Sequence, residues 1–147
     1  MSYDATDPDF QYLAIDKKAL LKKQAEAGDT KKMCFIPDEK EGWMKGEIQS
    51  TKGDDVVVLA DKGGEVTVKK DKVQQMNPPK FEMIEDMANL TYLNEAAILH
   101  NLRSRYYNSL IYTYSGLFCV AINPFRRLPI YGMNVVMKYK GKKRNEV

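Results

Sequence analysis

The side chains that most often carry chemistry are few and widely spaced in this sequence. His100 is the single histidine, and no cysteine or carboxylate stands at metal-ligand spacing from it, so we expect a packing or surface role. Cys34 and Cys119 lie in apolar stretches, which predicts free, buried thiols, with a disulfide as the lesser alternative. Since no nucleophile is paired with a base, the sequence gives little support to a small enzyme with its own catalytic centre.

The charged residues point to no strongly charged partner. A net charge of +3, from 23 basic and 20 acidic residues, is too mild to indicate nucleic acid. The apolar runs are too short to cross a membrane, and the acidic start MSYDATDPDF is unlike a signal peptide. We therefore expect an intracellular protein that binds neither membranes nor nucleic acid. A short basic segment near the end holds most of the asymmetry: Lys138, Lys140, Lys142, Lys143 and Arg144.

The elements that must position any site begin with an N-terminal extension, residues 1–30. Asp16 is placed to cap a short helix over residues 17–27, and Gly28 to end it. Nothing in the extension suggests chemistry.

Residues 31–79 have the texture of a small antiparallel β-barrel. Four strand-like runs, KMCFI, WMKGEIQST, VVVLA and EVTVKK, are separated by turn signals about every ten residues. Gly53, Gly63 and Gly64 fit tight hairpins, and Trp43 is expected in the core or at its rim. A barrel of about 45 residues buries little apolar surface, so we expect marginal stability.

The sequence after Pro78 and Pro79, residues 80–147, changes character. Apolar residues at helical spacing predict a helix over residues 94–107. Two strand-like runs, 110–114 and 117–122, follow, and the second is so apolar that burial on both faces of a large sheet is expected. Two strands cannot form such a sheet, and no third is evident. The sequence reads as if it were cut.

The strings NLTYLNEAAILHNL, RYY and IYTYSGLFCVAINPF, within residues 89–131, resemble the opening of the myosin motor domain, nearest to the conventional, striated-muscle class of heavy chain. Residues 31–79 resemble the N-terminal SH3-like domain of that family. The expected fold is therefore mixed, α+β: an SH3-like antiparallel barrel, then a helix and two strands of a truncated motor-domain sheet. The expected domains are an extension (1–30), the SH3-like domain (31–79) and the truncated start of the motor domain (80–147).

The resemblance implies a motor that moves along actin and uses ATP with magnesium, in the cytoplasm as part of the cytoskeleton, a myosin complex or a myofibril. Actin filaments and the rest of a heavy chain are the implied partners. Residues 123–131 match the loop that surrounds the adenine ring. An asparagine amide complements a purine edge, prolines stiffen the backbone, and tyrosine offers a flat face and a hydroxyl. Arg126 and Arg127 either lie near the ribose or face solvent. The implied adenine-side residues are Asn123, Pro124, Arg127 and Tyr131.

The sequence contains no phosphate loop of the form GxxxxGK[ST]. Gly141-Lys142 is followed by Lys143, and position 136, where the first glycine would stand, is Val136. We therefore expect this chain alone to show no ATPase activity and no tight binding of ATP or magnesium. The alternative interpretation is a free-standing SH3-like interaction module whose basic C-terminal tail binds an acidic partner or nucleic acid.

Overall fold

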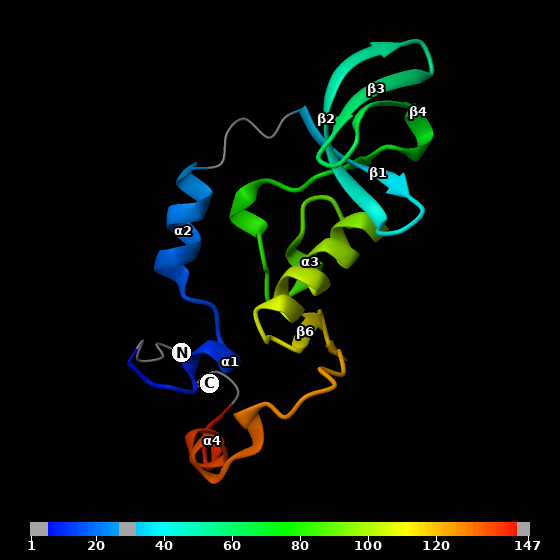
Figure 1. The fold of residues 1–147 in the computed structure, drawn as a ribbon. Coiled ribbons are helices and arrows are strands. Elements are labelled where there is room, and N and C mark those ends of the chain that lie inside the picture. Colours follow the sequence, from blue (N-terminus) through cyan, green and yellow to red (C-terminus); the bar gives the residue numbers. More distant parts are fainter. Residues whose placement is uncertain (1–5, 27–31, 144–147) are drawn as a thin grey trace.

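The computed structural model describes residues 6–26 and 32–143. A β-sheet domain lies at one end of the molecule, α3 lies beside it, and α1 and α4 lie together at the other end (Figure 1). The strands are β1 (Met33–Asp38), β2 (Gly42–Lys52), β3 (Asp55–Ala60), β4 (Gly64–Lys69), β5 (Gln74–Gln75), β6 (Tyr112–Ser115) and β7 (Phe118–Ala121). The α-helices are α1 (Phe10–Leu13), α2 (Lys17–Glu26), α3 (Glu95–Tyr107) and α4 (Met133–Tyr139).

The first five strands form one antiparallel sheet in the order β4-β3-β2-β1-β5. A break in register between Ile48 and Ser50 of β2 marks a bulge, which bends and twists a strand. Gly53 at the β2–β3 turn has φ +62°, a conformation that glycine adopts without strain. The expected SH3-like antiparallel fold is confirmed, and the two-residue β5 is a strand that the sequence did not reveal.

The core of this sheet consists of small and β-branched side chains. Cys34 and Ile36 of β1 pack against Val56, Val58 and Ala60 of β3, and all five are buried. Their alternate positions along each strand place them on one face of the sheet, because successive side chains of a strand point to opposite faces. Trp43 is half-buried at the rim.

The helix predicted after the barrel is confirmed as α3. Asn94 caps its first turn, because its side-chain oxygen accepts from the Ala97 amide at 2.9 Å. The Asn94 amide also donates to the Gln75 carbonyl (3.0 Å), and Gln74 accepts from the Ala96 amide (2.9 Å). These bonds fasten the start of α3 to the last barrel strand.

A buried arginine joins α3 to the β6–β7 hairpin. Arg105 donates to Thr113 Oγ1 at 2.8 Å, to the Tyr112 carbonyl at 2.7 Å and to the Met83 carbonyl at 3.1 Å. Burial lowers the pKa of the Arg105 guanidinium, while the nearby Glu85 carboxylate opposes that change. The hairpin is thus attached to the helix through charged donors, which make stronger hydrogen bonds than neutral ones.

One expectation for the hairpin, the burial of Cys119, proves wrong. Cys119 is exposed rather than buried, whereas Cys34 is buried, and both thiols are free. The strand β7 is not covered on both faces: Leu117 and Phe118 are 91% and 77% exposed. The reason is that β7 is an edge strand: β6 pairs with β7 on one side and makes a single bridge to Asp86 through Tyr114, and among the described residues no strand pairs with the other edge of β7.

The helices at the ends of the chain are short. Asp16 Oδ1 accepts from the amides of Lys18 (2.9 Å) and Ala19 (3.3 Å), so the predicted cap of α2 is confirmed, while Gly28 lies outside the described residues. The helices α1 and α4 are elements that the sequence patterns did not predict. Across residues 6–26 and 32–143, no helix is long and apolar enough to cross a membrane.

Candidate functional site

The loop formed by residues 123–131 connects the end of β7 to the start of α4. Its last three residues, Pro129–Tyr131, form a 3-10 turn, and Gly132 then begins α4. The loop therefore runs from the apolar hairpin to α4, at the end of the molecule opposite the five-stranded sheet (Figure 1). The conformation of the loop depends on the side chains that hold it along this path.

Two side chains from the C-terminal end of α3 and the residues after it hold the middle of the loop. The Tyr106 hydroxyl donates to the Pro124 carbonyl at 3.3 Å. Arg126 donates through Nη2 to Ser109 Oγ at 2.5 Å. Arg126 is exposed, but its guanidinium is bonded to Ser109. This arrangement does not decide between a place near the ribose and a position that faces solvent, the two roles considered from the sequence.

Asn123 shapes the start of the loop. Its Oδ1 accepts from the Phe125 amide at 2.9 Å, so the side chain caps a tight turn. Phe125 has φ +50° and is 90% exposed. The acceptor half of the Asn123 amide is therefore used inside the loop, which leaves its NH₂ group as the one suited to an external acceptor.

Tyr131 closes the loop at its other end. Its hydroxyl shares a hydrogen bond with the Tyr112 hydroxyl of β6, while the residue as a whole remains 72% exposed. The bond to Tyr131 raises the pKa of the Tyr112 hydroxyl above its usual value. Tyr131 thus keeps an open aromatic face whose orientation is fixed by a neighbouring strand.

The four residues predicted for the adenine side differ in how the structure holds them. Asn123, Pro124 and Tyr131 each take part in a bond that holds the loop, and Arg127 is exposed. The sequence missed the residues that hold this loop, because they are distant in the chain and of ordinary types. They are Tyr106, Ser109 and Tyr112.

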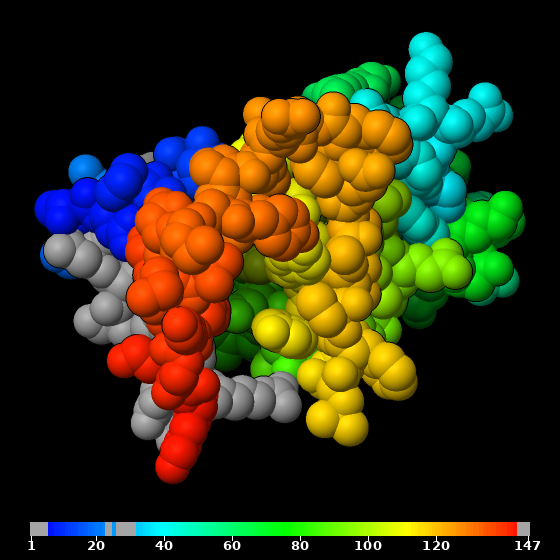
Figure 2. Space-filling model, turned by 90° about the horizontal axis from the view of Figure 1, so that it is seen from below, coloured from blue at the N-terminus to red at the C-terminus, as the bar shows by residue number. Residues whose placement is uncertain are grey.

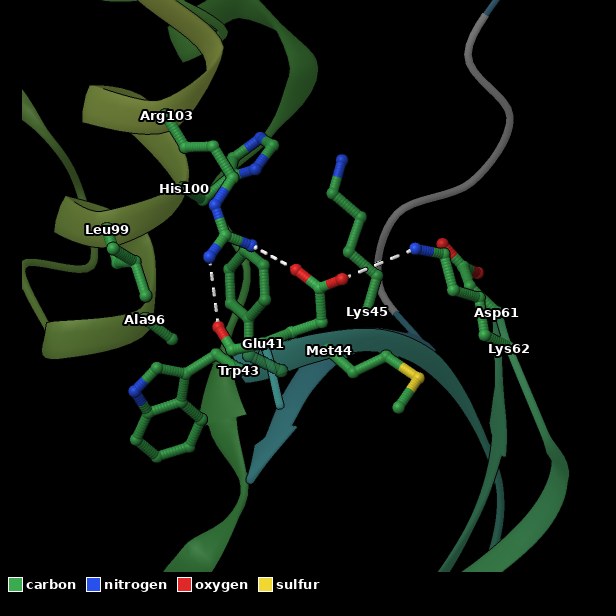
Figure 3. A pocket seen from close by; sticks show the side chains of 11 residues that line it. Glu41, Trp43, Met44, Lys45, Asp61, Lys62, Ala96, Leu99, His100 and Arg103 are labelled. Atoms are coloured by element: carbon green, nitrogen blue, oxygen red, sulfur yellow. Dashed lines mark hydrogen bonds and ion pairs between the residues drawn. The ribbon is translucent and has the colours of Figure 1, made fainter. Parts of the chain in front are cut away.

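A separate cavity of about 140 Å³ lies between the barrel and α3 (Figure 3). Arg103 of α3 crosses it and donates to Glu41 Oε2 at 2.9 Å and to the Glu41 carbonyl at 3.1 Å. Lys62 lies 3.6 Å from the other Glu41 oxygen. Apolar side chains, Trp43 and Leu99 among them, complete the lining. With its central carboxylate held by two cations, the cavity is a junction between domains and offers no nucleophile–base pair.

His100 borders this cavity and has a structural setting. Its ring packs against Phe35 with centroids 5.6 Å apart, and Nε2 lies 3.1 Å from both Glu82 oxygens. Burial by itself would raise the pKa of Glu82, but His100, Lys45 and Ser104 outweigh it and lower that pKa. Within the part of the chain that the structure describes, no three potential ligands are grouped to hold a metal ion.

Comparison with known proteins matches both halves of the chain. Residues 20–77 match the family model of the myosin N-terminal SH3-like domain, and residues 84–147 match that of the myosin head (motor domain). Myosin-3 of Caenorhabditis briggsae and Myosin-3 of Caenorhabditis elegans are each 55% identical over 141 residues, which is 96% of this chain and 7% of either relative. The chain belongs to the myosin heavy chain family, of which it carries the N-terminal SH3-like domain and the start of the motor domain.

Proposed function

We propose that these residues serve as the N-terminal part of an actin-based, ATP-driven motor, and that the loop 123–131 receives the adenine ring of ATP. The observation that carries the proposal is the anchoring of this loop. Bonds from Tyr106, Ser109 and Tyr112 hold it while the Tyr131 ring stays exposed. A preorganised loop loses less conformational entropy when it binds a ligand.

Each of the four residues has a distinct part in this proposal. The Asn123 NH₂ group donates to a ring nitrogen of the purine, and Pro124 stiffens the backbone beside it. Tyr131 stacks its exposed face on the base. Arg127, which is exposed, lies on the side of the ribose.

The energy available from these contacts is small. Two or three neutral hydrogen bonds contribute roughly 0.5–1.5 kcal/mol each, whereas association costs on the order of 4–15 kcal/mol in lost freedom. In a nucleotide motor, contacts to the phosphates and to magnesium make up the difference, and the phosphate-loop motif that supplies many of them does not occur in this sequence. We therefore infer that ATP and magnesium are held mainly by other parts of a heavy chain, and that these residues alone do not hydrolyse ATP.

The partners and location follow from the same proposal. The chain would work with the remainder of a heavy chain and, through it, with actin filaments. Its place would be the cytoskeleton, a myosin complex or a myofibril.

The adenine-side role is tested with Asn123→Ala in a myosin motor domain that contains this segment. Loss of the hydrogen bond to the purine should weaken ATP binding about 2- to 13-fold. Loss of the turn bond to the Phe125 amide should weaken ATP and GTP binding alike. GTP, with a different purine edge, should be affected less, so the preference for ATP over GTP should fall. Asn89→Ala, at another exposed asparagine, is the matched control. An unchanged preference in Asn123→Ala would refute the adenine contact.

The isolated chain provides the second test. We expect no measurable ATP turnover and an ATP affinity no tighter than about millimolar, from the balance of contact and association energies above. Equilibrium dialysis with radiolabelled ATP measures this directly. Micromolar binding would show that the chain holds more of the nucleotide site than the loop.

A further inference from the structure

The two ends of the described chain meet through a cluster of charged side chains. Lys138 of α4 forms an ion pair with Asp7, and its Nζ lies 3.1 Å from Asp9 Oδ2. Asn134, one turn earlier on the same helix, donates to the same oxygen of Asp9. The N-terminal segment and α4 lie side by side in both views (Figures 1 and 2). We call these four residues the terminal latch.

Burial distinguishes the latch from an ordinary surface ion pair. Asp9 is only 8% exposed, and a buried carboxylate without partners is strongly destabilising. Asp7 is tied to it, because Asp7 Oδ1 accepts from the Asp9 amide at 3.0 Å. The hydrogen bond from Lys138 lowers the pKa of Asp7, so the Asp7 carboxylate is ionised at neutral pH.

The latch lies on the helix that directly follows the adenine-side loop. Both Val135 and Val136 donate their amides to the Gly132 carbonyl, at 2.9 and 3.0 Å, and Gly132 is the neighbour of Tyr131. The helix α1 also contacts the 3-10 turn Pro129–Tyr131. A shift of α4 would therefore move the backbone of Tyr131 away from the position that its bond to Tyr112 requires.

We propose that Asp7 and Asp9 are positioning residues for the purine-binding loop: the N-terminal extension holds α4 through the terminal latch, and α4 holds Tyr131. This inference rests on the proposed function of the loop. It assigns a role in nucleotide selectivity to an extension whose sequence suggested no chemistry. The two carboxylates act through the helix and do not touch the nucleotide.

The first arm of the test asks whether the latch holds the helix. In a motor domain that contains this segment, Asp9→Ala and Lys138→Ala should each speed amide hydrogen exchange in residues 132–139 by about tenfold without nucleotide. The two effects should be less than additive in the double variant, because both single variants remove the contact between Lys138 and Asp9. Lys140→Ala, at an exposed lysine that ends the same helix, is the control. Unchanged exchange in the latch variants would overturn the proposal, and normal exchange in the barrel strands verifies that the variants fold.

The second arm asks whether the latch positions the loop. The ratio of ATP to GTP affinity should fall about threefold or more in both latch variants, whereas a purely structural role would weaken the two nucleotides equally. Asn123→Ala, at the residue proposed to contact the purine edge, separates the two hypotheses. If it lowers the ratio and the latch variants do not, the inference fails while the adenine-side function stands. If neither lowers it, the proposed function of the loop fails and the inference fails with it.

Discussion

Replacement of Gly46 by alanine is the sharpest test of how the barrel packs. Gly46 is buried on β2, and a methyl group there would lie 2.4 Å from Val58 Cγ1 and 3.0 Å from the Leu59 carbonyl oxygen. Val58 is 0% exposed and surrounded by the core, so it has no free space to enter. Overpacking of this kind costs about 1–3 kcal/mol. Because one contact is with backbone, we expect a loss near the upper end, about 3 kcal/mol, which is a large fraction of the stability of so small a domain.

The structure also predicts a partial rescue. Val58→Ala alone should cost about 2 kcal/mol, since it removes two buried methyl groups worth about 0.8 kcal/mol each and leaves a cavity. It also removes the atom that the new methyl group would strike, so the double variant should be at least about 1 kcal/mol more stable than the sum of the single effects predicts. The rescue stays incomplete because the Leu59 carbonyl remains in place.

Urea unfolding measured by the fluorescence of Trp43, the single tryptophan, reports on this barrel directly. Gly53→Ala is the matched control. Its added methyl group would meet no atom within 4 Å, but φ +62° strains any side chain there. Val58→Ala should not change that strain, so the stability effects of Gly53→Ala and Val58→Ala should add. If the Gly46 and Val58 effects add within about 0.5 kcal/mol, the steric reasoning is wrong.

Three further outcomes follow from the buried charges and thiols. Arg105→Met leaves three oxygen acceptors without their donor and should destabilise the β6–β7 hairpin by about 3–5 kcal/mol, measured by hydrogen exchange; unchanged exchange there would contradict this. Burial raises the pKa of Cys34 from 9.0 to about 11, which lowers its thiolate fraction about 100-fold, so iodoacetamide should label exposed Cys119 first; equal rates, followed by mass spectrometry, would refute this. His100→Ala removes a lowering influence on Glu82 and should raise the Glu82 pKa in a ¹³C NMR titration. Since the folded-state pKa of Glu82 is lowered, the stabilising contribution of its carboxylate is complete above about pH 4.5 and is lost as the pH falls through the folded-state pKa. A Glu82 pKa that is unchanged in His100→Ala would exclude the bond to His100 as the cause of the lowered value.

The elements that local rules determine were predictable from the sequence. The helix α3 and the strands of the barrel could be predicted from the spacing of apolar residues, from capping residues and from turn glycines. All of these signals are local, because the residues that form each one lie close together in the sequence. The bond between Tyr112 and Tyr131 and the latch between Asp9 and Lys138 were not predictable. Each joins residues of common types whose separation in the chain is unrelated to any helical or strand period, so only the folded structure brings them together.

The burial of Cys119 was misjudged for a related reason. An apolar run such as residues 117–122 shows that a strand is suited to a covered position, but it does not show that the covering elements are present. Cys119 was expected to be buried because its neighbours in sequence are apolar, whereas its surroundings in space are open. The composition of a segment thus predicts whether its side chains favour burial. Whether they are in fact buried depends on which other segments pack against them.

The exposure of this hairpin bears on the nucleotide binding proposed for the loop. Leu117, Phe118 and Phe125, which flank or belong to the loop and its hairpin, are 91%, 77% and 90% exposed. Covering three such side chains would contribute about 1.5–3 kcal/mol each, which is comparable to the association cost of 4–15 kcal/mol that the adenine contacts fail to meet. The loop itself is fastened by neutral hydroxyls and one arginine, all on the side of α3 and β6. We therefore expect purine binding to be coupled to the packing of another part of a heavy chain over this hairpin, because the same burial that satisfies β7 would immobilise the open side of the loop.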